Sequence, residues 1–167
     1  MNADPLLFDD IMAQYGQDVW NLAYTLTRRV DLADDVTQDV FLSIYQKLDT
    51  FRGDASLRTW LLRITRNKAY DCRRSYYLRK VTLVDLFIER GQHPSAEQEA
   101  LGNLVTDDAW AAVLKLPVKY REVLILHAHY NMTNAEIAVV LDLLEATVKT
   151  RLHRARKKAY ELMKGDA

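Results

Sequence analysis

Apolar side chains recur every three or four residues along most of this chain, a spacing typical of one buried face of an α-helix. Five glycines and three prolines among 167 residues leave few sites for tight turns, which disfavours a β-sandwich. The sequence therefore predicts an all-α protein. The apolar stripes lie within residues 7–26, 33–48, 57–72, 104–116, 120–124, 137–141 and 148–162.

Residues 80–103 interrupt this spacing. They contain Gly91, Pro94 and Gly102 among polar side chains, a composition typical of a linker between domains. We expect two small helical domains, at residues 1–79 and 104–167, joined by a flexible linker at 80–103. For the third helix of the first domain, which follows the N-cap candidate Ser56, the spacing predicts an inner face at Leu57, Leu61, Ile64 and Cys72.

Charge is unevenly distributed, although the formal net charge is +0. Residues 52–80 carry nine basic and two acidic side chains, and residues 149–167 carry seven and two. The rest of the chain is acidic. Two basic blocks suggest two contacts with a polyanion such as nucleic acid, while two solvated helix faces would give the same pattern.

A helix-turn-helix pattern occupies the C-terminal region. Thr133 and Glu136 form a capping box at the start of a short helix, which ends at residues 142–144 before a longer basic helix. The outer face of that last helix is polar, and such a face suits the major groove of DNA. A solvated basic helix is the alternative. The predicted contacts are Lys149, Thr150, Arg151, His153, Arg154 and Lys157.

The third helix carries a stripe of basic and aromatic side chains at steps of three and four. Cations with interleaved rings suit single-stranded or opened DNA, because bases stack on the rings while phosphates are neutralised. Trp60, Phe51 and the Gly53 loop could receive an unstacked base, although a tryptophan such as Trp60 is more often a core residue than a stacking platform. The stripe is Arg63, Arg66, Tyr70, Arg73 and Tyr77, with Asn67 and Arg74 beside it.

Other patterns mainly exclude functions. The polar face of the second helix (Asp34, Asp35, Gln38 and Asp39, with Leu42 nearby) is usually just the solvated side of a helix. The single cysteine, Cys72, allows no internal disulfide and no cysteine-based zinc site. We found no phosphate loop, catalytic triad or paired carboxylates, so the sequence predicts neither an enzyme nor a cofactor. Without a signal peptide or membrane-spanning run, a cytoplasmic protein is expected.

Three segments resemble bacterial sigma factors. Residues 31–41 (DLADDVTQDVF) are similar to their core-polymerase-binding segment, and residues 51–67 (FRGDASLRTWLLRITRN) to their promoter-melting segment. Residues 116–124 (LPVKYREVL), 136–138 (EIA) and 147–156 (TVKTRLHRAR) resemble their C-terminal domain. With only these two domains, the chain is similar to the extracytoplasmic-function group.

The resemblance implies a transcription initiation factor that binds core RNA polymerase and promoter DNA. It assigns Asp35, Gln38, Asp39 and Leu42 to docking on the clamp helices of the largest polymerase subunit. An anti-sigma protein, often linked to a membrane, holds such factors inactive. The −10 element would be recognised by Phe51, Arg52, Ser56, Trp60, Arg63, Arg66, Asn67, Tyr70, Arg73 and Arg74, and the −35 element by Lys149, Thr150, Arg151, His153, Arg154 and Lys157.

Two residues depart from the family pattern in the turn before the last helix. Asp142 stands where glycine is usual, and Leu144 stands where serine would cap the helix, and both departures bear on the seating of that helix. A stand-alone helix-turn-helix repressor or activator is the alternative function. It would account for residues 133–158 but would leave the stripe on the third helix without a role.

Overall fold

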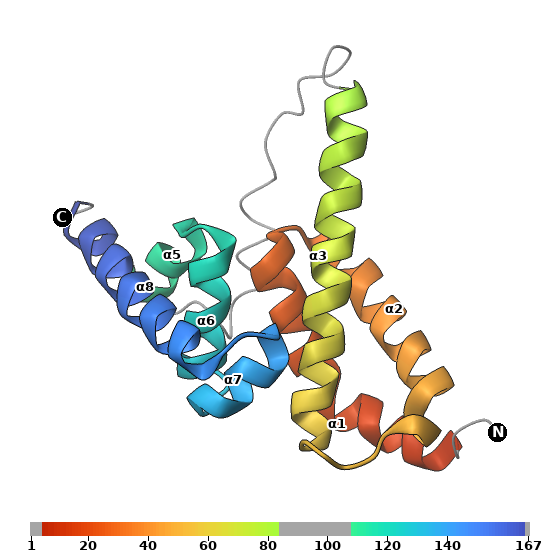
Figure 1. Cartoon of the computed structure of the whole chain (residues 1–167). Coiled ribbons are helices and arrows are strands. Elements are labelled where there is room, and N and C mark those ends of the chain that lie inside the picture. Colours follow the sequence, from red (N-terminus) through yellow and green to blue (C-terminus); the bar gives the residue numbers. More distant parts are fainter. Residues whose placement is uncertain (1–4, 84–107, 166–167) are drawn as a thin grey trace. The chain divides into compact units, whose positions relative to one another are not determined.

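The computed structural model describes residues 5–83 and 108–165, and every regular element in these two ranges is a helix. The chain divides into two compact units, Met1–Ala100 and Leu101–Ala167, which are described separately (Figure 1). The all-α prediction is confirmed. Most of the predicted linker, from residue 84 onward, lies outside the described residues.

Unit 1 is a three-helix assembly of α1 (Pro5–Thr27), α2 (Val30–Lys47) and α3 (Leu57–Leu83). A 3-10 turn, η1 (Leu48–Thr50), follows α2. All three helices pack on one another, and the C-terminal half of α3 extends well past α1 and α2 (Figure 1). The helix ends at Leu83, beyond the predicted domain end at residue 79.

The core of unit 1 is formed by the apolar stripes, with one difference on α3. Val19, Leu22, Leu26, Val36, Val40 and Ile44 are each no more than 1% exposed. On α3 the most deeply buried side chains are Leu61, Leu62, Thr65 and Ala69. Leu57, Ile64 and Cys72 are only partly buried, so the predicted inner face of α3 is rotated from the observed one.

The start of α3 is set by the loop before it. Gly53 has a φ of 77°, a left-handed conformation that costs a residue without a Cβ little. The backbone N–H of Thr59 then donates to Ser56 Oγ at 3.1 Å, which confirms Ser56 as the N-cap. This cap holds residues 51–56 against the first turn of α3.

Unit 2 contains α5 (Asp108–Lys115), α6 (Val118–Ala128), α7 (Asn134–Leu141) and α8 (Glu145–Gly165). Helices α5, α6 and α7 all pack against α8 (Figure 1). Thr133 caps α7 by accepting from the N–H of Glu136 at 3.1 Å, so the capping residue is confirmed. The buried centre consists of Val123, Leu126, Tyr130, Ile137, Val140, Val148 and Leu152.

The turn between α7 and α8 contains the first departure from the family pattern. Asp142 adopts a left-handed conformation, with φ 54° and ψ 53°, and terminates α7. The N–H of Leu143 donates to Ala138 O at 3.0 Å, so the carbonyls at the end of α7 are satisfied. An aspartate thus occupies a backbone geometry that glycine adopts more cheaply.

Candidate nucleic-acid and polymerase interfaces

The polar face of α2 lies on the surface of unit 1, where Asp34 accepts a hydrogen bond from Trp20 Nε1 at 2.8 Å. Asp35, Gln38 and Asp39 are exposed, and Leu42 is 59% exposed despite being apolar. On the opposite side of the helix Val36 and Val40 are buried in the core. The four predicted docking residues therefore lie side by side on a surface that the fold does not use.

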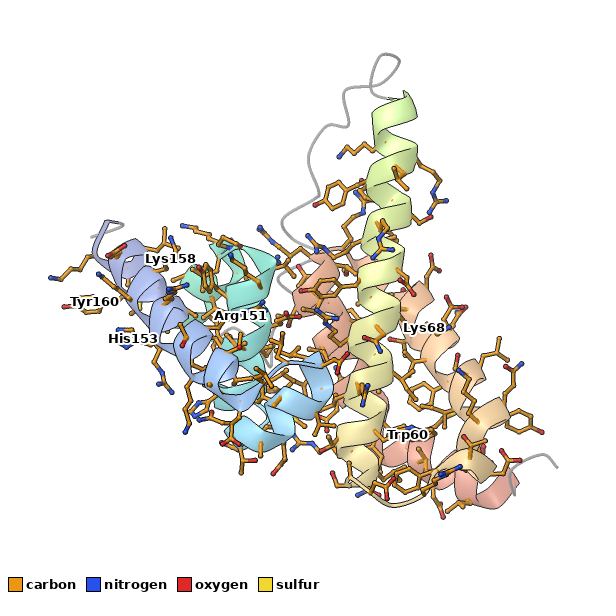
Figure 2. All side chains as sticks on the ribbon, viewed as in Figure 1. Trp60, Lys68, Arg151, His153, Lys158 and Tyr160 are labelled. Atoms are coloured by element: carbon orange, nitrogen blue, oxygen red, sulfur yellow. The ribbon has the colours of Figure 1, made fainter. Side chains whose placement is uncertain are left out.

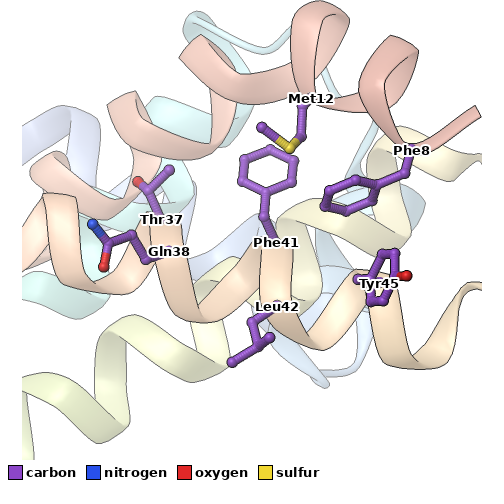
Figure 3. Close-up of a pocket in the computed structure, with 7 residues that line it drawn as sticks. All are labelled: Phe8, Met12, Thr37, Gln38, Phe41, Leu42 and Tyr45. Atoms are coloured by element: carbon purple, nitrogen blue, oxygen red, sulfur yellow. The ribbon is translucent and has the colours of Figure 1, made fainter. Parts of the chain in front are cut away.

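An apolar groove of about 420 Å³ adjoins this surface, between α1 and α2. Phe8 meets the rings of Phe41 and Tyr45 edge-on, at centroid distances of 6.3 and 5.2 Å. In Figure 3 Met12 points from α1 toward Phe41. Sequence analysis missed the groove, because its walls come from two helices and each aromatic taken alone resembles a core residue. Its lining is Phe8, Met12, Thr37, Gln38, Phe41, Leu42 and Tyr45.

Four residues of the predicted stripe on α3, from Arg66 to Tyr77, form a ladder of cations and rings. The guanidinium carbon of Arg66 lies 3.7 Å from the centre of the Tyr70 ring. Arg73 lies between two rings, 5.7 Å from that of Tyr70 and 5.6 Å from that of Tyr77. Because these cations stand over ring faces, they are held at the surface in a defined order. Arg63, Asn67 and Arg74 are exposed around the ladder.

The loop before α3 brings Phe51 and Trp60 together. Their ring centroids are 5.1 Å apart with an interplanar angle of 41°, and both side chains are half-buried (Figure 2 labels Trp60). Arg52 is exposed beside them. The hydroxyl of Ser56 is engaged locally, since it also donates to Thr59 Oγ1 at 2.8 Å. The structure therefore places an aromatic pair at the foot of the ladder.

A second set of contacts holds α3 against the start of α2. Arg29 donates to the Tyr76 hydroxyl at 2.7 Å and lies 4.7 Å from the centre of its ring. The same guanidinium also bonds to Asp31, and this hydrogen bond lowers the pKa of Asp31 below its usual value. Arg29 thus joins residues that are far apart in sequence and fixes the position of the C-terminal half of α3.

Cys72 lies on α3 near the acidic face of α2. Burial raises the pKa of the Cys72 thiol above its usual value, and the Asp35 carboxylate raises it further. A protonated thiol is a poor nucleophile and a poor metal ligand. In residues 5–83 and 108–165 no group of histidine, cysteine and carboxylate side chains is arranged to hold a metal ion. Over the same residues no helix is long and apolar enough to cross a membrane.

The outer face of α8 presents most of the predicted DNA contacts. Lys149, Thr150, His153, Arg154 and Lys157 are all exposed, while Val148, Leu152, Ala155 and Ala159 are buried on the other side. The Thr150 hydroxyl donates to Ala146 O at 3.1 Å, which leaves its oxygen facing solvent as an acceptor. Side chains of varied length thus share one face of a second helix, as the major groove requires.

Arg151 is the exception among the predicted contacts on α8. It turns toward α6, where its Nη1 lies 3.9 Å from Oε1 of Glu122, and its side chain is only 29% exposed. Figure 2 shows Arg151 on the α6 side of α8 and His153 projecting from the other side. Sequence analysis assigned no role to Glu122, although a glutamate directly before the apolar run of residues 123–126 is a visible signal of a buried partner.

The comparisons with known proteins agree with both units. The family Sigma-70 region 2 matches residues 11–80, and the family Sigma-70, region 4 matches residues 106–158. A stand-alone helix-turn-helix regulator would account only for the second match.

Relatives span almost the whole chain. The chain is 30% identical over 161 residues to the ECF RNA polymerase sigma factor SigW of Bacillus subtilis, a match that covers 90% of this chain and 85% of SigW. It is 32% identical over 168 residues to the RNA polymerase sigma factor CnrH of Cupriavidus metallidurans, covering 96% and 88% of the two chains.

Two solved structures share the fold. The sigma factor RpoE in complex with the anti-sigma factor NepR from Bartonella quintana has a TM-score of 0.77 and 27% identity, over 96% of this chain and 98% of that chain. CnrH in complex with the cytosolic domain of CnrY has a TM-score of 0.73 and 28% identity, over 99% and 92%. The chain is therefore a transcription initiation factor that directs RNA polymerase to promoters, a member of the extracytoplasmic-function group of the sigma-70 family.

Proposed function

We propose that this sigma factor uses three separate surfaces, one for core polymerase and two for promoter DNA. The observation that carries the proposal is that α2 and α3 of one unit expose surfaces of opposite character. The α2 face is acidic, and the α3 face is a ladder of cations and rings. A docking surface and a DNA surface can therefore act at the same time on unit 1.

The docking surface consists of Asp35, Gln38, Asp39 and Leu42. Its position on an exposed helix face supports binding to the clamp helices of the largest polymerase subunit, as the resemblance of residues 31–41 implies. The apolar groove shares Gln38 and Leu42 with this surface. An interface with an apolar centre and a polar rim fits a protein partner better than a nucleic acid.

The −10 surface is the α3 ladder together with the loop that precedes it. Arg63, Arg66 and Arg73 neutralise phosphates, Tyr70 holds the Arg66 guanidinium over its ring, and Asn67 and Arg74 contact base edges or backbone. At the foot of the ladder the loop and its aromatic pair receive a flipped base. The loop contributes Phe51, Arg52 and Ser56, and the first turn of α3 contributes Trp60.

The −35 surface is the outer face of α8. Arg154 and Lys149 are placed to donate to base edges or phosphates, and His153 and Thr150 offer shorter donors and acceptors between them. Lys157, one turn further along, is suited to a phosphate. Because these residues share one exposed face, they can enter a single major groove together.

An anti-sigma factor is a further proposed partner. The solved complexes of the similar proteins contain the anti-sigma factor NepR in one case and the cytosolic domain of CnrY in the other. We infer that this chain is also held by an inhibitor of this kind, which would compete for the polymerase and DNA surfaces. A cytoplasmic location follows from the proposed partners, since core polymerase and promoter DNA lie there.

Run-off transcription with purified core polymerase tests the proposal. Genomic DNA is transcribed with and without the sigma factor, and the new start sites are mapped. We expect starts that share one −35 and one −10 sequence, and we expect none with core polymerase alone. Footprinting of the sigma factor as a dimer on an operator, with no polymerase requirement, would contradict the proposal.

A further inference from the structure

Glu122 is a carboxylate inside the core of unit 2. The residue is 0% exposed, and on α6 it is followed by the buried residues Val123 and Leu124. Removing a carboxylate from water costs free energy that only a well-placed partner offsets. Arg151 of α8 supplies a positive charge, with Nη1 3.9 Å from Glu122 Oε1, an ion pair that is too long for a hydrogen bond. This ion pair therefore connects the helix beneath α8 to one defined position on α8.

The ion pair lies on one flank of the buried stripe of α8. At 3.6 residues per turn, Arg151 and Arg156 are about 140° apart around the helix, on either side of Leu152 and Ala155. Arg156 Nη2 lies 3.4 Å from Nδ1 of His127, which also belongs to α6. Helix α8 thus contacts α6 through a polar group on each flank of the apolar stripe between them.

The apolar stripe alone would specify the rotation of α8 only loosely. Of the four buried side chains of the stripe only Leu152 is large, and a small rotation about the helix axis would change the burial of Val148, Ala155 and Ala159 little. An ion pair to a buried carboxylate responds more strongly, because rotation separates the charges in a medium of low dielectric constant. The direction in which the outer face points is therefore coupled to this pair.

We propose that Arg151 is a positioning residue of the −35 surface. Its pair with Glu122 sets the rotation of α8 and hence the register of Lys149, His153 and Arg154 on the bases, and Arg151 itself contacts no DNA. The inference rests on the proposed role of α8 and reassigns one of its six predicted contacts. A residue that acts through Glu122 must lose its effect when Glu122 is changed.

The test uses the holoenzyme, assembled from the full chain and core polymerase, on a set of promoters that differ at single −35 positions. Arg151→Gln, Glu122→Gln and the double variant are compared with wild type. We expect each single change to lower use of the preferred promoter by about tenfold, the value of one good base contact. All three variants should show the same altered ranking of −35 sequences, and the double variant should lose no more than either single one.

The ranking of −35 sequences distinguishes a positioning effect from a loss of folded protein. Unfolding lowers the use of every promoter by the same factor and therefore leaves the ranking unchanged. Far-UV circular dichroism gives the folded fraction, and if Glu122→Gln fails to fold, the ranking obtained with Arg151→Gln decides. Lys157→Gln is the matched control, because it removes an exposed cation from the same helix. It should weaken all −35 variants equally and reduce the salt dependence of binding by about one ion.

Two results would overturn the inference. One is an unchanged ranking in Arg151→Gln. The other is a loss in Arg151→Gln that resembles the Lys157→Gln control while Glu122→Gln behaves as wild type, which would make Arg151 a phosphate contact. The variants His153→Ala and Arg154→Ala test the proposed −35 role of α8 independently of Arg151. If neither affects any −35 variant, the role assigned to α8 fails, whatever Arg151 does.

Discussion

Arg66 stands over Tyr70, with its guanidinium carbon 3.7 Å from the ring centre. The pair fixes a cation at one point of the α3 surface, where a displaced single strand would need a phosphate contact. Arg73 lies 5.7 Å from the centre of the same ring. The ladder is therefore assembled before any DNA binds.

Replacing Arg66 and Arg73 together by alanine should abolish promoter opening, because the displaced strand loses two phosphate contacts. Permanganate reactivity at the start site measures opening, and binding to core polymerase should be unchanged. A premelted bubble template should rescue the double variant. Lys68→Ala is the matched control, because Lys68 lies about 160° around α3 from Arg66. Normal opening of duplex promoters by the double variant would show that the ladder is only a solvated face.

Asn67→Ala should alter the preferred −10 sequence. Asn67 is exposed beside the ladder, and its amide can both donate to and accept from a base edge. Transcription from promoters with single −10 substitutions measures the preference. Ser75→Ala, an exposed position further along the same helix, should leave the preference as it is. Equal losses on every −10 variant would show that Asn67 contacts the DNA backbone rather than a base edge.

Gln38→Ala combined with Asp39→Ala should weaken binding to core polymerase. Both residues are exposed on a helix whose other face is buried, so the thermal unfolding midpoint should change little. Gel filtration of the sigma factor with core polymerase measures the binding. Asp49→Ala removes an exposed carboxylate just beyond α2 and serves as the control. Unchanged binding of the double variant to core polymerase would show that the docking surface lies elsewhere.

The variants Arg154→Ala and Lys157→Ala should change −35 recognition in different ways. If Arg154 holds a base edge, its loss should cost about 1–3 kcal/mol at the preferred −35 sequence and relax the preference at one position. Lys157→Ala should weaken binding evenly across sequences, since a phosphate carries no base information. A series of −35 variants distinguishes the two. Equal losses on every −35 variant for Arg154→Ala would show that Arg154, like Lys157, contacts the DNA backbone.

Asp142→Gly should stabilise unit 2 by up to about 1 kcal/mol, because glycine adopts the left-handed conformation at lower cost. Hydrogen exchange of the α7 and α8 amides measures the local free energy of opening. Ala135→Gly, at an exposed position in the first turn of α7, should instead destabilise, by less than the roughly 1 kcal/mol that glycine costs in a helix interior. We therefore expect the two changes to glycine to alter the free energy of opening in opposite directions. Destabilisation by Asp142→Gly would mean that the aspartate side chain holds the turn.

The sequence determined the features that depend on neighbours within one or two turns. The helices follow from apolar spacing, and the caps at Ser56 and Thr133 follow from side chains that reach the backbone three residues on. The order of cations and rings on α3 also follows from the helical repeat, which brings Arg66, Tyr70 and Tyr77 to one face.

The tertiary structure decided what depends on residues far apart in the chain. Leu62 and Thr65, rather than Leu57 and Ile64, are fully buried on α3, because α1 and α2 determine which side of that weakly apolar helix is covered. The groove between Phe8 and Tyr45 exists only where two helices meet. Arg151 turns toward α6, where Glu122 places a buried carboxylate 3.9 Å from its guanidinium, and the spacing of residues along α8 carries no information about Glu122.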